Sequence, residues 1–160
     1  LNIIAACFVF VIGVGLTDKI FLNLPNALEV HRLTDYHLVS NEIDDLLEHI
    51  GSPIAKNHFN VFEKADFKPH AAFKFEKFYK KATSIALKNT KGQKLTLCFY
   101  PKNYKLPHND IVHVDGMQVF HGSTSTHNFA YWEKSNMTLV LISDSLLPHE
   151  LVELAGPLID

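Results

Sequence analysis

The chain has 160 residues, of which 47% are hydrophobic and 20% charged, and its formal net charge is −2. These values exclude a wholly disordered chain, and they also exclude collagen-like, coiled-coil and disulfide-scaffold proteins. The length suits one domain, or one domain with an appendage. The small net charge conceals a division: twelve lysines and three acids lie between residues 56 and 105, whereas three basic residues and fourteen acids lie elsewhere. Such a basic section faces an anionic partner, lies near the acidic part of the same chain, or is solvated.

The first predicted element is a membrane anchor. Residues 2–16 carry no charge, but a transmembrane helix needs roughly 17–25 apolar residues. Because the chain starts at Leu1 rather than at Met, we expect upstream residues to complete a single span that includes residues 1–17. The alternatives are a signal-peptide core and a buried helix. Residues 18–25 would then form a juxtamembrane linker.

Residues 26–50 are predicted to form one long amphipathic helix. Pro25 and Asn26 suit a helix N-terminus, and Gly51 and Pro53 stop the helix. Apolar side chains recur at steps of three and four residues, namely Leu28, Tyr36, Val39, Ile43, Leu46, Leu47 and Ile50. The other face carries Glu42, Asp45, Glu48 and His49.

Beyond the helix the apolar period changes from 3.6 to 2, which predicts strands. Residues 57–62 are a short strand candidate, and residues 73–81 fit both strand alternation and a helical stripe. Residues 83–89 and 94–100 flank Gly92 and predict a hairpin. Residues 103–115 are polar and interrupted by Pro107, which indicates a loop.

The last part of the chain predicts three strands over residues 116–121, 127–133 and 137–143, with turns at 122–126 and 134–136. A final helix over residues 148–155 should end at Gly156 and Pro157, with Ser143 or Asp144 as its cap. The predicted fold class is therefore α+β. It comprises a small antiparallel sheet with a long N-terminal amphipathic helix and a short C-terminal helix, preceded by the apolar span. Residues 26–160 would form one extracytoplasmic domain.

The sequence offers few candidate residues for metal binding or catalysis. His113, His121 and His127 lie near one predicted turn, and a Zn²⁺ or Cu²⁺ site would need three or four such ligands to converge. Their spacing matches no strong metal signature, so surface histidines are the more ordinary interpretation. Ser123 or Ser125 beside His127 would need an orienting carboxylate and oxyanion donors, which the sequence does not specify. The chain contains no G-x-S-x-G, H-E-x-x-H or P-loop motif. We therefore predict no catalytic residue and no cofactor.

Two further features have structural and functional interpretations. The lysine-aromatic segment 67–81 is similar in composition to single-strand nucleic-acid platforms, but it lacks any module signature, and its rings suit a sheet core. Cys98 lies in the apolar run LTLCFY and is predicted to be a small core residue.

The C-terminal stretch carries one family resemblance. Residues 131–144 read YWEKSNMTLVLISD, and Leu146, Leu147, Leu151, Leu154 and Ala155 follow. This stretch resembles the end of bacterial single-pass membrane anti-sigma factors and related uncharacterised membrane regulators. Those proteins show a strand with a Trp, a tight turn, a strand ending in V/I-S-D, and a helix with spaced leucines. Residues 94–101 (KLTLCFYP) are similar to their preceding strand.

The resemblance covers roughly residues 84–156 with gaps. The usual Gly-rich turn of the family is Lys134-Ser135-Asn136 here, and residues 109–128 have no counterpart. The resemblance implies a non-enzymatic regulator in the inner membrane whose periplasmic domain senses a signal. A cytoplasmic segment before Leu1 would bind a sigma factor, and an envelope protease or anionic ligand is a further candidate partner; nucleic acid is not. Trp132 should pack on the sheet. The alternative is a periplasmic binding module for a metal ion or an anionic ligand.

Overall fold

The computed structural model describes residues 59–77, 80–101 and 110–159. Its elements follow the order α4 (Asn60–Lys64), β1 (Lys68–Lys77), β2 (Lys80–Lys88), β3 (Lys94–Pro101), β4 (Asp110–Val114), β5 (Met117–Ser123), β6 (Asn128–Lys134), β7 (Met137–Ser143) and α5 (Pro148–Ile159). In these described ranges the fold is α+β, with one antiparallel sheet and two short helices. The predicted span 1–17, linker 18–25 and helix 26–50 lie outside the described residues. Within the described ranges, no helix has the length and apolar character needed to cross a membrane.

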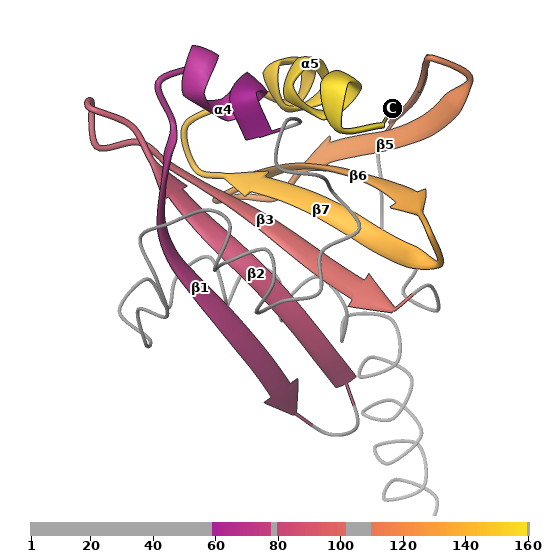
Figure 1. The fold of residues 1–160 in the computed structure, drawn as a ribbon. Coiled ribbons are helices and arrows are strands. Elements are labelled where there is room, and N and C mark those ends of the chain that lie inside the picture. The colour runs from indigo at the N-terminus through magenta and orange to yellow at the C-terminus, as the bar shows by residue number, and fades with distance from the viewer. Residues whose placement is uncertain (1–58, 78–79, 102–109, 160) are drawn as a thin grey trace, which may run out of the picture.

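The sheet consists of two meanders joined side by side, in the order β1-β2-β3-β7-β6-β5-β4 (Figure 1). The first meander contains β1 to β3, and the second contains β4 to β7. They meet where β3 pairs antiparallel with β7, with Cys98 opposite Val140. This register confirms the hairpin predicted over residues 83–100, and β5, β6 and β7 confirm the three strands predicted after it.

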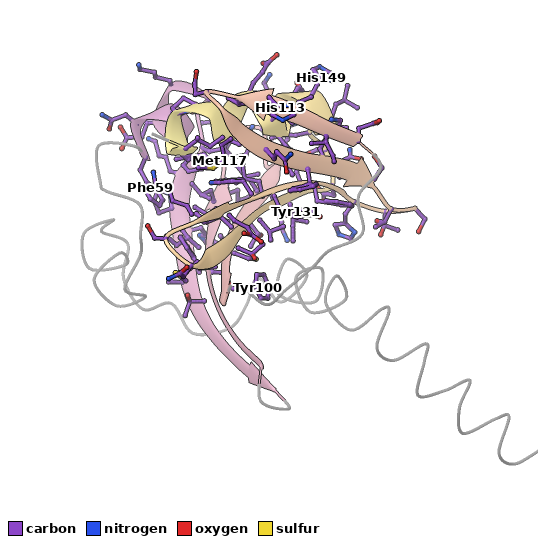
Figure 2. The ribbon with its side chains drawn as sticks, turned by 90° about the vertical axis from the view of Figure 1, so that its right-hand side faces the viewer. Phe59, Tyr100, His113, Met117, Tyr131 and His149 are labelled. Carbon is purple, nitrogen blue, oxygen red and sulfur yellow. The ribbon has the colours of Figure 1, made fainter. Side chains whose placement is uncertain are left out.

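Both faces of the sheet are apolar, because the central strands are continuous hydrophobic runs. Helices α4 and α5 lie against one face (Figure 1), here called the helix face. Its buried sheet residues include Ile85, Leu97, Trp132, Leu139 and Leu141. The opposite or second face is formed by Ala71, Ala86, Cys98, Tyr100, Phe129, Tyr131, Val140 and Ile142, with Phe120 beside them. Figure 2 shows Tyr100 and Tyr131 on the side away from α5 and Met117 on the α5 side.

Helix α4 corrects the strand predicted over residues 57–62, since residues 60–62 belong to this single helical turn. Phe59 and Phe62 are both buried, and their rings meet edge to face with centroids 5.5 Å apart. A spacing of three residues places two side chains on one side of a helix but on opposite sides of a strand. Burial of both rings in one core therefore favours the helix.

Strand β4 was not predicted, because residues 103–115 were interpreted as a loop. Asp115 and Gly116 both have positive φ, at 49° and 81°, and they connect the paired residues Val114 and Met117. This is the geometry of a two-residue hairpin turn, for which Asp-Gly is a preferred sequence. The turn closes β4 onto β5 at one edge of the sheet.

Helix α5 begins at Pro148 as predicted, but its cap and its end differ from the prediction. Its first residue is Pro148, and the backbone N–H of Leu147 donates to Glu150 Oε2 at 2.7 Å, as in half of a capping box. Ser143 instead stabilises the preceding turn: its Oγ accepts from the N–H groups of Ser145 and Leu146 and donates to the Lys94 carbonyl. Neither Ser143 nor Asp144 is the helix cap.

The helix also continues through Gly156 and Pro157 to Ile159, four residues beyond the predicted end. Leu158 and Ile159 are buried in the core of the helix face, so tertiary packing outweighs the local helix-stopping signal. The Lys134 ammonium group donates to the carbonyls of Leu158 and Ile159 at 3.1 and 3.0 Å. It thereby satisfies carbonyl groups that have no partner within the helix.

Lys134→Met is expected to lower the free energy of unfolding by about 1–3 kcal/mol, the usual value of hydrogen bonds from a charged donor. The substitution keeps the apolar stem but leaves the last carbonyls of α5 without their donor. Urea denaturation followed by circular dichroism measures the loss. The matched control is Lys88→Met at an exposed position, which should change stability by less than about 0.5 kcal/mol. Equal losses in the two variants would contradict the cap.

Candidate functional site

The three candidate metal-binding histidines do not converge. His113 is paired with Gln118, whereas His121 lies three residues further along β5, opposite Asp110 and Ala130. Side chains alternate along a strand, so His113 and His121 belong to opposite faces of the sheet. Among the described residues no group of three His, Cys, Asp or Glu side chains has the geometry to hold a metal ion.

His127 is built into the turn between β5 and β6. Its ring Nδ1 lies 2.7 Å from Thr126 Oγ1, and its backbone exchanges hydrogen bonds with Thr124. Ser123 Oγ donates to Asn128 Oδ1 at 2.7 Å rather than to His127. Asn128 in turn donates to the Leu146 carbonyl, which ties this turn to the start of α5. The side chains of Ser123 and His127 therefore stabilise the turn, and their hydrogen bonds form no nucleophile–base pair.

A hollow of about 450 Å³ opens where α4, the β2–β3 turn and α5 meet. Its wall mixes cations, anions and apolar side chains, including Lys64, Asp66, Lys91, Glu150 and Glu153. The turn beside it is held by Asn89, whose Oδ1 accepts from the Gln93 N–H at 2.8 Å. Two of the carboxylates are already engaged, because Glu150 accepts from the Leu147 N–H and Asp66 accepts from Thr90. The sequence did not predict this hollow, because it depends on the packing of three separated segments.

Asp66 links the end of α4 to the β2–β3 turn. Its carboxylate accepts hydrogen bonds from the hydroxyl and the backbone N–H of Thr90, the latter at 3.2 Å. These bonds lower the pKa of Asp66 from its ordinary value of 3.8, and the nearby Lys68 and Lys91 lower it further. The ionised side chain thus connects two loops that are 24 residues apart in the sequence.

The lowered pKa of Asp66 predicts acid-sensitive stability. Stability from this group is complete above its ordinary pKa of 3.8 in the unfolded chain and is lost as the pH falls through the lower folded value. Thr90→Val removes the hydroxyl donor and should reduce this loss. The test compares melting temperatures at pH 7 and at pH 3 for the unmodified chain and the variant. Ser125→Ala, at an exposed position away from Asp66, is the control and should retain the full acid sensitivity.

Lysines form a row across the first meander. Lys68 is paired with Lys88 in β1 and β2, and Lys88 is paired with Lys94 in β3. Directly opposed like charges destabilise a sheet. The row therefore favours the approach of an anionic group to this end of the second face.

Two titratable side chains of the second face, Cys98 and Tyr131, are shielded from solvent. Burial raises the pKa of the Cys98 thiol to about 12, and it raises that of Tyr131 to about 12 with the help of the nearby Glu133 carboxylate. The Tyr131 ring stacks on Phe120, with centroids 4.8 Å apart and planes inclined by 12°. Cys98 thus keeps its proton at neutral pH and acts as a core residue, as the sequence predicts.

Comparison with known proteins returned no match, whether to a protein-family model, to a curated protein or to a solved structure.

Proposed function

We propose that this chain is the sensory part of a non-enzymatic, membrane-anchored regulator of the anti-sigma-factor type. Residues 1–17 would form a single span in the inner membrane, and the α+β domain would lie in the periplasm. A cytoplasmic segment before Leu1 would hold the sigma factor, while the domain responds to a ligand, a lipid or an envelope protease. In this scheme a signal favours one state of the domain, and the span transmits the change.

One observation carries the proposal. The residues that resemble the anti-sigma family form a single packed unit: β6 with the buried Trp132, the turn at Ser135 and Asn136, β7 ending at Ser143, and α5. Lys134 and Asn128 bind this hairpin to the helix from its two ends. A hairpin and a helix that pack together in this way suit a domain that passes on a change of state.

The test is affinity purification of the full-length protein from its native membrane, with mass spectrometry of the proteins that copurify. We expect a sigma factor, and we expect it to disappear when everything before Leu1 is deleted. Recovery of envelope proteins alone would overturn the regulator and favour an anchored binding or assembly module.

The lysine row favours the alternative of an anion-binding module. If that role is correct, inorganic polyphosphate should raise the melting temperature of the unmodified chain, because a ligand of the native state stabilises it. Lys68→Gln and Lys88→Gln together should abolish the shift, whereas Lys134→Gln, on another part of the sheet, should retain it.

The alternative of a metal-binding module predicts that Zn²⁺ or Cu²⁺ raises the melting temperature of the unmodified chain. The substitutions His121→Ala and His127→Ala should remove this rise.

A further inference from the structure

The hollow where α4, the β2–β3 turn and α5 meet is lined entirely by described residues. Helices α4 and α5 lie on the helix face (Figure 1) and contact each other. The volume of the hollow, about 450 Å³, falls within the range of about 300–1,000 Å³ that ligand pockets occupy. Its size therefore suits a small molecule, and the chemistry of its lining indicates which kind.

Apolar side chains form one part of this lining. Several of them pack against the helix-face core and yet remain only partly buried, namely Val61, Ala65, Leu146 and Leu154. Apolar surface of this kind is removed from water when an apolar ligand covers it, and that burial favours binding. The ligand should therefore have an apolar body.

The side of the hollow that belongs to α4 and the β2–β3 turn is cationic. Lys64 at the end of α4 and Lys91 in the turn are both exposed and belong to the lining. Asp66, the carboxylate of the lining on this side, already accepts hydrogen bonds from the hydroxyl and the backbone N–H of Thr90. Lys68 also lies near Asp66 and adds a further positive charge. This side of the hollow therefore attracts an anionic group.

The same side offers an oriented neutral donor in Gln93. Asn89 holds this residue twice, since its Oδ1 accepts from the Gln93 backbone N–H at 2.8 Å and its Nδ2 donates to Gln93 Oε1 at 2.7 Å. The Gln93 Oε1 atom is thus engaged, which leaves the Nε2 group to donate to an acceptor in the hollow. A carboxylate can accept from an amide donor and from ammonium groups at the same time.

The α5 side of the hollow is anionic. Glu150 and Glu153 both belong to the lining, and a spacing of three residues places them on one side of the helix. Glu150 Oε2 accepts from the Leu147 N–H, which leaves its other oxygen for a ligand, and Glu153 is exposed. Within the described part of the chain, no ion pair joins either carboxylate to Lys64 or Lys91. Opposite charges thus border one hollow without pairing with each other.

We propose that this hollow binds a short zwitterionic peptide with apolar side chains, of about two or three residues to suit its volume. The peptide carboxylate accepts hydrogen bonds from Lys64, Lys91 and Gln93, and the peptide ammonium group donates to the carboxylates of Glu150 and Glu153. The side chains of the peptide cover the partly buried apolar lining. A ligand with only one sign of charge is repelled by one side of the hollow.

The inference deepens the proposed function, because such a peptide would be the signal that the sensory domain detects; only this role rests on that proposal. The binding test involves no sigma factor, so the failure of one proposal is distinguishable from the failure of the other. The probe is dileucine, titrated calorimetrically into the full chain in detergent micelles. We expect saturable binding and a raised melting temperature, since a ligand of the native state stabilises it.

Matched ligands that each lack one feature test the chemistry of the site. N-acetyl-dileucine lacks the ammonium group, dileucine amide lacks the carboxylate, diglycine lacks the apolar side chains, and free leucine lacks the second residue. We expect each of them to bind about tenfold or more weakly than dileucine, because each loses a charge-assisted hydrogen bond or apolar burial.

Substitutions in the chain assign each charge of the peptide to its partner. In Lys64→Gln with Lys91→Gln, dileucine and its amide should bind with nearly equal affinity, because the carboxylate has lost both cationic partners. In Glu153→Gln, dileucine should lose most of its advantage over the N-acetylated form. Glu63→Gln, exposed on α4 but outside the lining, is the matched control and should retain both preferences. Circular dichroism shows whether the variants are folded.

The peptide site is wrong if dileucine shows no saturable binding, or if its N-acetylated and amidated forms bind as tightly as dileucine itself. It is equally wrong if the folded variant that lacks both lysines still prefers dileucine to the amide. Equal binding of free leucine would overturn the assignment of the ligand as a peptide.

Discussion

Replacing Trp132 by alanine is expected to lower the free energy of unfolding by about 3–5 kcal/mol, because it empties the largest site in the helix-face core. The side chain is fully buried between β6 and α5, and it belongs to the same cluster as Leu139, Leu151 and Ala155. A loss of this size is a large fraction of the stability of an ordinary domain. Far-UV circular dichroism during urea denaturation measures it, since Trp132 is the only tryptophan and its fluorescence is removed with it.

The control for this prediction is Trp132→Phe. The indole Nε1 is buried without a hydrogen-bond partner among the described residues. An unpaired buried donor costs about 1–3 kcal/mol, and phenylalanine removes that donor while it keeps most of the ring. We therefore expect less than half of the destabilisation caused by alanine. Similar losses in the two variants would show that the indole N–H has a stabilising partner.

Replacing Cys98 by aspartate is expected to have the second large effect. Cys98 lies at the centre of the second face and is fully buried. A carboxylate there would lose its hydration, and such a group shifts its pKa upward rather than remain charged. We expect a loss of about 3–5 kcal/mol at neutral pH, comparable to breaking a buried ion pair. Urea denaturation at pH 7 measures it.

The sign of the pH dependence gives a second check on Cys98→Asp. A raised folded pKa means that the native state holds its proton where the unfolded chain has released it, so stability falls as the pH rises. The deficit should therefore be smaller at pH 5 than at pH 8. Lys88→Asp, exposed on the same face, is the matched control and should change stability by less than about 1 kcal/mol. A mild effect of Cys98→Asp would show that the second face is open to water.

Much of the sheet could be predicted because its signals are local. The apolar runs of β6 and β7, the turn residues between them and the glycine between β2 and β3 each depend on neighbouring residues. Asp115 and Gly116 carried an equally local hairpin signal, but Pro107 and the polar residues before them favoured a loop over a strand. The errors at α4 and at the end of α5 have a different origin, because both helices are decided by burial against the sheet.

The candidate site was harder to predict for the same reason. His121 and His127 are close in sequence, but the structure places them apart. His121 lies within β5 opposite Ala130, whereas His127 is held in the β5–β6 turn by its hydrogen bond with Thr126. The pairing of Asp66 with Thr90 joins segments 24 residues apart and leaves no periodic signature. The lysine row likewise depends on strand register, although the charge division of the sequence indicated that a basic surface exists.

The joining of two meanders through β3 and β7 has a consequence for how the chain folds. Within each meander every strand pairs with its neighbour in sequence, so the loops to be closed are short. The β3–β7 pairing brings together residues such as Lys94 and Ser143, which are 49 positions apart. Loop-closure entropy makes such non-local pairing slow. We therefore expect the two meanders to form early and their docking, which completes the core beneath α5, to limit the folding rate.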